Sequence, residues 1–330
     1  MKSDAPGKLV ISGAYSVLLG APALVAAVDR RVYADTAQGS NYESKEVTCG
    51  LALLAANPKY TLSAPLARPW YDARQLRGAR DKLGLGSSAA ICVASLALTL
   101  SQLTHHNILS PSSEQEAERF RRSLLDKLYP LALAAHREAQ GGGSGIDVAA
   151  ACYGGFFSAR LDSKSNESSP LAITRVSLPS SLCLEVWASP NPATTSEFVR
   201  AVMNQRTQQP RQFQFLMHDQ MQASENALEA VNQSDSSALV SALRQQLVAL
   251  KKIGQLAQVS IVESVVSILN NVLDTDCVFL PSGAGGGDIT LYAGPHPSPP
   301  EFRKKALGMN LRRLDLQLGA PGLQLHWDIK

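Results

Sequence analysis

The sequence lacks most of the signals that mark a metal-binding, secreted or membrane-spanning protein. Its five cysteines are odd in number and include no CxxC pair, which argues against a zinc site and a disulfide framework. Buried thiols in a reducing compartment are the simplest interpretation. The longest apolar run, residues 89–100, is interrupted by Ser95 and Thr99 and falls short of the ~18 residues that a spanning helix needs. With no signal-peptide pattern at the N-terminus, we expect a cytoplasmic protein without membrane contact.

Charge is also scarce and nearly balanced. Asp, Glu, Lys and Arg make up 18% of the 330 residues, and 31 basic against 28 acidic residues leave a formal net charge of +3. Nucleic-acid binding needs a clustered basic surface, so this small excess argues against it and remains compatible with a small anionic ligand. At ~150 residues per domain the length predicts two domains. The polar stretch 162–170 is typical of a linker, which places the domains at 1–165 and 166–330.

Apolar periodicity and turn residues predict strands mixed with helices in both halves, which favours α+β or α/β architecture. We expect strands over residues 10–19, 23–34, 156–161, 182–188, 277–280, 289–293 and 323–329. We expect helices over residues 88–103, 146–152, 212–231, 237–256 and 261–272. A further helix begins at a capping box formed by Ser113 and Glu116, and Pro130 should kink or break it before a segment that ends near residue 140.

A glycine-rich turn precedes the most apolar helix and reads GLGSSAA over residues 84–90. Glycines allow close approach of a ligand to the backbone, and the first N–H groups of a helix favour an anion. The segment therefore resembles a phosphate-binding turn, although a plain glycine turn with a serine N-cap explains it equally well. Better-known phosphate and catalytic motifs, namely GxxxxGK[ST], the Rossmann fingerprint, GxSxG and HExxH, are absent.

A second glycine run, residues 141–143, leads into a short helix with Asp147 in its first turn. The helix dipole favours the ionised carboxylate there, and such a group can orient an acceptor or take its proton. An aspartate that serves only the stability of the helix is the alternative. A third segment, residues 282–288, contains four glycines within five residues, more than a plain turn between strands needs.

Three segments in this order resemble the three motifs of the GHMP small-molecule kinases: PGKLVISGAYSVL (residues 6–18), GLGSSAA (84–90) and SGAGGGD (282–288). Within that family, HREAQG (136–141) and GSGIDVAAA (143–151) are most similar to phosphomevalonate kinases. The resemblance implies a two-domain α+β fold, with a ribosomal-protein-S5-like N-terminal domain, a ferredoxin-like C-terminal domain and the site between them. It also implies a reaction in the mevalonate pathway of isoprenoid biosynthesis, the Mg²⁺-dependent transfer of a phosphoryl group from ATP to 5-phosphomevalonate, giving 5-diphosphomevalonate.

Carried over residue by residue, the resemblance assigns catalytic roles to Lys8 and Asp147. It assigns ATP binding to Gly84, Leu85, Gly86, Ser87, Ser88 and Ala89, with Ser88 also at the Mg²⁺ ion. It assigns substrate binding to Ser12, Gly13, Arg137, Ser144, Gly145, Ser282, Gly283 and Ala284. A dianionic acceptor beside ATP requires cations, for which the candidates are Lys8, Lys82, Arg137 and Arg160.

Two positions depart from the family pattern. Ala14 stands where the first motif usually has a glutamate, and His136 stands where many members have a Mg²⁺-binding glutamate. These departures leave other functions open: a mevalonate kinase, another small-molecule kinase of the family, or a catalytically idle homologue that senses a ligand. In each case the expected partner is a small molecule, and the protein is expected to be a monomer or a homodimer.

Overall fold

The computed structural model describes residues 1–38, 43–60, 66–77, 83–104, 111, 113–161, 171–190 and 195–327. Its strands are β1 (Lys2–Ser12), β2 (Ala23–Asp35), β3 (Trp70–Asp72), β4 (Phe156–Leu161), β5 (Leu171–Arg175), β6 (Cys183–Ala188), β7 (Val278–Pro281), β8 (Ile289–Gly294), β9 (Arg312–Leu314) and β10 (Gln324–His326). Its α-helices are α1 (Lys45–Ala55), α2 (Ser87–Thr104), α3 (Glu114–Gln140), α4 (Ile146–Tyr153), α5 (Thr195–Gln208), α6 (Pro210–Asn232), α7 (Ser236–Ala257), α8 (Ser264–Asn270) and α9 (Pro300–Gly308). Two 3-10 helices, η1 (Ser16–Leu19) and η2 (Arg74–Leu76), complete the set of elements.

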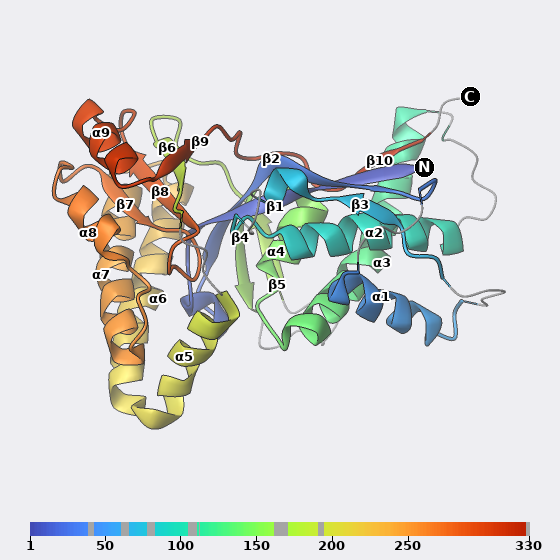
Figure 1. Cartoon of the computed structure of the whole chain (residues 1–330), viewed down its shortest axis with the longest axis horizontal. Coiled ribbons are helices and arrows are strands. Elements are labelled where there is room, and N and C mark those ends of the chain that lie inside the picture. The colour runs from blue at the N-terminus through green and yellow to red at the C-terminus, as the bar shows by residue number, and fades with distance from the viewer. Residues whose placement is uncertain are drawn as a thin grey trace.

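The strands form two antiparallel sheets, of which the first extends from the centre to the right of Figure 1 and the second lies at the left. The first sheet has the order β10-β1-β2-β4-β5, with β3 also paired to β2. The second has the order β7-β8-β6-β9. Helices α1, α2 and α3 lie beneath the first sheet, and the long helices α6 and α7 lie side by side beneath the second (Figure 1).

The first sheet is built from both halves of the sequence. Residues 162–170, the expected linker, lie outside the described ranges, so the division at residue 165 stays a prediction. Two strands beyond that point, β5 and β10, nevertheless belong to the first sheet, where β5 pairs with β4 and β10 pairs with β1. The sheet therefore depends on residues from the C-terminal half.

Helix α2 forms the centre of the core beneath the first sheet. It contacts β1, β2 and the neighbouring helices α1, α3 and α4. Of the helices that the structure describes, α2 alone is long and apolar enough to cross a membrane, and 78% of it is buried inside the protein. Its small residues Ala89, Ala90, Ala94 and Ala97 are fully buried, which allows close packing on every side.

The expected strand over residues 10–19 is wrong in its second half. β1 ends at Ser12, and Gly13 and Tyr15 then adopt positive φ angles of 90° and 63°. Residues in this left-handed region cannot continue a strand, so the chain turns sharply and forms η1. The apolar run there reflects burial of the turn, since Tyr15 and Val17 are each 4% exposed.

Pro130 does not break the helix that begins at Ser113. The Ser113 side chain accepts a hydrogen bond from the Glu116 amide, as the capping box predicts, and α3 then continues through Pro130 to Gln140. Leu128, Tyr129 and other apolar residues around the proline are buried, and this packing outweighs the lost backbone hydrogen bond.

All five cysteines are unpaired. Cys92, Cys152 and Cys277 are buried as expected, whereas Cys49 and Cys183 are partly exposed, which corrects the expectation of five buried thiols.

Candidate functional site

The glycine-rich turn of residues 84–86 leads directly into α2. Gly84 and Gly86 have φ angles of +70° and +77°, and the Ala90 amide donates to the Gly86 carbonyl at 3.2 Å. This hydrogen bond makes Ser87 the first helical residue, so the next N–H groups have no carbonyl partner within the helix. The side chains of Leu85, Ser87 and Ala89 are buried, while Ser88 is only partly buried. Ligand contacts at this turn would therefore come from backbone N–H groups and the Ser88 hydroxyl.

Strand β1 passes against this turn at Gly7 and Lys8. The Lys8 amide donates to the Leu85 carbonyl at 2.8 Å, and the Lys8 Nζ lies 3.5 Å from the Gly84 carbonyl oxygen. A Cβ atom at Gly7 would lie 2.6 Å from the Leu85 oxygen, so only glycine permits this approach. Gly7 had no predicted role, because its significance depends on this contact across the fold.

Asp147 is brought beside Lys8 from the first turn of α4. A Cβ atom built on Gly86 would lie 2.9 Å from Lys8 Cγ and 3.8 Å from Asp147 Cβ, so both side chains flank the glycine. Asp147 Oδ1 accepts a hydrogen bond from the Val148 amide at 3.0 Å, and its side chain is 23% exposed. The structure thus places Lys8 and Asp147, both predicted as catalytic, at the start of α2.

Two carboxylates act on the Lys8 ammonium. Burial lowers the pKa of Lys8, and the negative charges of Asp147 and Asp288 raise it in opposition, with burial the stronger effect. Asp288 immediately follows the glycine-rich segment 283–287 and had no predicted role. The fold therefore adds a second acidic residue to the surroundings of Lys8.

His136 of α3 lies between Ser88, at the start of α2, and Asp147, in the first turn of α4. Its Nε2 atom lies 3.3 Å from Ser88 Oγ and 3.4 Å from Asp147 Oδ2, and the side chain is 9% exposed.

Glu46, a buried acidic residue on α1, accepts hydrogen bonds from Ser44 at 2.7 Å and Gln140 at 2.6 Å. Burial favours a higher pKa for Glu46, but these hydrogen bonds and the neighbouring His136 outweigh it and lower the pKa.

The turn after β1 is held by a buried glutamine of α7. Gln246 Nε2 donates to Ser12 Oγ at 2.7 Å, and Gln246 Oε1 accepts from the Gly13 amide at 3.0 Å. Gln220 of α6 donates to the Ala14 carbonyl at 3.0 Å. Ser12 and Gly13 were predicted to bind substrate, and the structure commits these polar groups to contacts with α7.

The third motif, residues 282–288, docks on the end of β1. Ser282 Oγ donates to the Val10 carbonyl at 2.9 Å and accepts from the Val10 amide at 3.1 Å. Tyr15 donates its hydroxyl hydrogen to the Ala284 carbonyl at 2.5 Å. A Cβ atom at Gly283 would lie 3.8 Å from Lys8 Nζ. Of the three predicted substrate-binding residues here, Gly283 lies beside Lys8. The side chain of Ser282 is hydrogen-bonded to Val10 of β1.

Glycines form the loop between α3 and α4, where further substrate-binding residues were predicted. Arg137 Nε donates to the Gly143 carbonyl at 3.2 Å, and Ser144 Oγ accepts from the Ile146 amide at 3.5 Å. Gly145 has a φ of +84°, and a Cβ there would lie 2.3 Å from Leu133 Cδ1, so it serves the close packing of this loop on α3.

Arg160, another candidate cation, does not join this group. Arg160 forms two hydrogen bonds of 2.7 Å with the Glu225 carboxylate and one of 3.0 Å with the Gly20 carbonyl. Its guanidinium is thus committed to another ion pair. Lys82 lies outside the described residues.

The family resemblance also implies a Mg²⁺ ion, and the donor set at the start of α2 fits only limited protein coordination. Within the described ranges, no three His, Cys, Asp or Glu side chains gather closely enough to hold a metal ion. Mg²⁺ commonly binds through one or two protein oxygens together with phosphate oxygens and waters. The partly buried Ser88 hydroxyl fits that mode as a single oxygen ligand, whereas His136 beside it offers a nitrogen.

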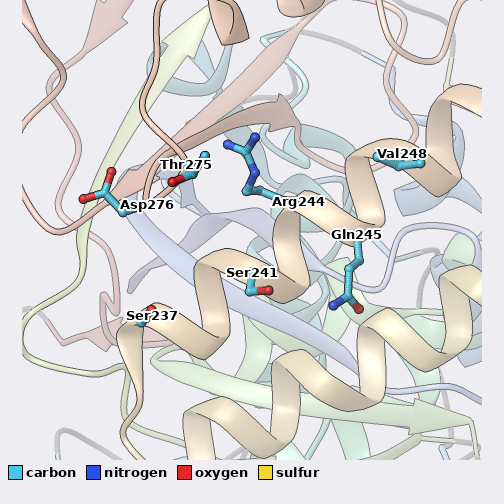
Figure 2. A pocket seen from close by; sticks show the side chains of 7 residues that line it. All are labelled: Ser237, Ser241, Arg244, Gln245, Val248, Thr275 and Asp276. Carbon is cyan, nitrogen blue, oxygen red and sulfur yellow. The ribbon is translucent and has the colours of Figure 1, made fainter.

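Two surface hollows lie elsewhere. One, of about 480 Å³, is lined by Ser237, Ser241, Arg244, Gln245 and Val248 of α7 and by Thr275 and Asp276 (Figure 2). The other, of about 500 Å³, lies between α6 and α7 around Phe215 and Lys252. Neither contains a residue predicted for the site. Arg244 points from α7 and donates to the Cys277 carbonyl at 2.6 Å, which explains its place in the first hollow without a ligand.

The fold matches solved structures over nearly the whole chain. A Lin0012 protein from Listeria innocua matches with a TM-score of 0.74 and 19% identity, covering 98% of this chain and 99% of that chain. Phosphomevalonate kinase from Streptococcus pneumoniae, in complex with phosphomevalonate and AMPPNP, matches with a TM-score of 0.68 and 16% identity, covering 96% and 99%. Mevalonate kinase from L. major, in complex with R-mevalonate, matches with a TM-score of 0.64 and 19% identity, covering 97% and 96%.

No protein-family model and no curated protein sequence matches the chain. Its likeness to kinases is therefore one of three-dimensional structure at low sequence identity, and it extends to almost every part of the chain. The expected α+β class is confirmed, and the chain has the fold of the GHMP small-molecule kinases.

Proposed function

We propose that this protein is a kinase that transfers the γ-phosphoryl group of ATP to 5-phosphomevalonate and yields ADP and 5-diphosphomevalonate. The observation that carries the proposal is the meeting of Lys8 and Asp147 beside Gly86, at the start of the buried helix α2. The resemblance of residues 136–151 to phosphomevalonate kinases supports this acceptor. So does the fold shared with a phosphomevalonate kinase in complex with phosphomevalonate and AMPPNP.

In this proposal the start of α2 binds the triphosphate. The unpaired N–H groups of its first turn and the positive end of the helix dipole favour the phosphate oxygens. Lys8 adds one positive charge near the transferred group, where phosphoryl transfer depends chiefly on positioning and charge neutralisation. Ser88 would hold the Mg²⁺ ion that ATP carries, and that ion would neutralise charge on the β- and γ-phosphates.

The acceptor would enter from the side of Asp147 and the glycine loop of residues 141–143. An oxygen of its phosphate forms a bond to the γ-phosphorus while the bond between that phosphorus and the bridging oxygen of ADP breaks. A phosphomonoester has a second pKa of about 6, so this oxygen is largely ionised at neutral pH and needs no base. Arg137, at the end of α3 beside this loop, is the proposed cation for the acceptor phosphate.

Mevalonate is the second candidate acceptor, and the charges around Lys8 favour it. Asp147 and Asp288 place two negative charges beside one lysine, which suits a neutral hydroxyl better than a dianion. In that reaction the mevalonate hydroxyl oxygen attacks the γ-phosphorus, and the Asp147 carboxylate takes the hydroxyl proton.

Release of ADP, measured separately with phosphomevalonate, mevalonate and diphosphomevalonate, tests the proposal. We expect the highest kcat/KM with phosphomevalonate. Faster turnover of mevalonate would reassign the acceptor, and binding of ATP without turnover of any of the three would favour a ligand-sensing homologue.

The proposal also keeps the expectations of a cytoplasmic monomer or homodimer with an ATP-binding domain over residues 1–165.

The Asp147→Asn variant tests the role of the carboxylate. With phosphomevalonate we expect slower turnover through misplacement of the acceptor. With mevalonate we expect a larger loss, about 100-fold or more, because the base is also lost. The melting temperature should stay close to that of the wild type, since the Val148 amide can still donate to the asparagine oxygen. Wild-type kcat in this variant would remove Asp147 from the reaction.

A further inference from the structure

Asp288, at the end of the third motif, packs directly on the glycine turn before α2. A Cβ atom built on Gly84 would lie 2.7 Å from Asp288 Cβ and 3.0 Å from Asp288 Oδ2. The same Gly84 offers its carbonyl oxygen to Lys8 Nζ at 3.5 Å. The Asp288 carboxylate therefore lies against the backbone that the Lys8 ammonium also contacts.

The backbone fixes Asp288 in this place. Its φ angle is +40°, a left-handed conformation that residues other than glycine adopt uncommonly and that aspartate tolerates better than most. Its carbonyl accepts a hydrogen bond from the Ser189 amide at 2.8 Å, and the Ser282 amide donates to the Ile289 carbonyl at 2.9 Å across the base of the loop. The loop therefore sets the direction in which the Asp288 Cβ atom leaves the backbone.

Lys8 has acidic residues from two parts of the fold around it. Asp147 comes from α4, and Asp288 comes from the loop before β8 in the second sheet. His136 of α3 lies 3.4 Å from Asp147 Oδ2, and Gly283 lies beside the Lys8 ammonium without a charge of its own. With Asp147 alone, the ammonium would be drawn into a single ion pair, away from an incoming phosphate.

We propose that Asp288 is a positioning residue for Lys8, which balances the pull of Asp147 and keeps the ammonium pointing at the transferred phosphoryl group. This inference rests on the proposed function, in which Lys8 contacts that group. A carboxylate packed on the phosphate-binding turn opposes nucleotide binding by charge repulsion, so its benefit would lie in the reaction and not in affinity for ATP.

We expect the Asp288→Asn variant, which keeps the side-chain size and removes the charge, to change kcat without weakening nucleotide binding. We expect kcat to fall about tenfold or more, while the dissociation constant for AMPPNP, measured by calorimetry, stays equal or decreases. Asp276→Asn is the matched control, since Asp276 is an exposed aspartate of the same half that lines the surface hollow of Figure 2. The control should match the wild type in both measurements.

A kcat within twofold of the wild type would overturn the inference, and so would weaker AMPPNP binding together with a lower melting temperature, which indicates a merely structural role. Acylation of Lys8 in the nucleotide-free protein, followed by peptide mass spectrometry, gives a readout that needs no acceptor. Loss of the neighbouring charge should make Lys8 react several-fold faster in Asp288→Asn, because its amine is more often neutral. If the wild type turns over no acceptor but this labelling still changes, the proposed function fails while the electrostatic effect of Asp288 on Lys8 stands. Unchanged labelling refutes that effect.

Discussion

Substitution of Gly86 by alanine tests whether the geometry beside Lys8 controls the reaction. The φ angle of +77° at Gly86 is one that an L-residue adopts at a penalty of roughly 1–2 kcal/mol. Alanine also restricts the unfolded chain, which offsets about 0.4–1 kcal/mol of that penalty. We therefore expect the free energy of unfolding to fall by only about 1 kcal/mol.

The effect on turnover should be larger than the effect on stability. The new methyl group would lie 2.9 Å from Lys8 Cγ and 3.5 Å from Lys8 Cε, so the lysine side chain must shift. Misplacement of a reacting group by ~1 Å can lower a rate by about 100-fold, and a shift of a few tenths of an ångström should lower kcat by about tenfold.

Gly20→Ala provides the matched control for this experiment. Gly20 has a φ of +90°, and the nearest atom to a Cβ there is the Leu161 oxygen at 4.0 Å, so the variant carries the backbone strain without a steric contact. Urea denaturation should show similar losses of stability in both variants, and a coupled ADP assay should show slower turnover only in Gly86→Ala. Equal kcat values for the two variants would refute the reasoning about Lys8.

Three further variants test separate parts of the structure. In Gln246→Leu the buried Gly13 amide loses its acceptor, and the unfolding free energy should fall by about 1–3 kcal/mol in urea denaturation. Glu185, 7% exposed, accepts hydrogen bonds from Ser298 and Arg303, and Glu185→Gln should lower stability by about 2 kcal/mol without changing nucleotide affinity. Ser88→Ala should raise the Mg²⁺ concentration that half-saturates AMPPNP binding by about threefold or more. An unchanged Mg²⁺ dependence would remove Ser88 from the metal site.

Local patterns in the sequence were sufficient for elements that are strongly apolar or have a regular apolar spacing. The apolar helix expected over residues 88–103 is α2, and the strand expected over residues 156–161 is β4. The long amphipathic helices of the second half also appear, as α6 and α7. In α6 and α7 the apolar spacing reflects the face that packs on the core, whereas α2 is apolar along almost its whole length because it is buried on every side.

Elements with mixed composition were missed or shortened. Helix α1 was not among the expected helices, and the last expected helix, over residues 261–272, is only seven residues long in α8. α1 is stabilised by a Ser44 cap and by packing on α2 and α3, and these tertiary contacts are not visible in a local window.

Some residues of the candidate site could be predicted from the sequence, and others could not. Lys8 and Asp147 could be assigned roles because the family resemblance carries roles for these positions, and the fold brings them together. Gly7 and Asp288 lie within the same motifs and His136 departs from the pattern, but what each of them does follows only from contacts with residues far away in the sequence, such as the approach of Gly7 to Leu85. No spacing rule predicts such contacts, since they depend on how β1, α2 and the third motif pack in three dimensions.

The pairing of β10 with β1 has a consequence for biogenesis. β1, which carries Lys8, finds one of its two neighbours near residue 325, about three hundred positions later in the sequence. Such long-range closure is slow, and it requires most of the polypeptide to have left the ribosome. A nascent chain halted after β4 would expose one edge of β1, so competence for ligand binding should emerge late in synthesis, after the second half has folded.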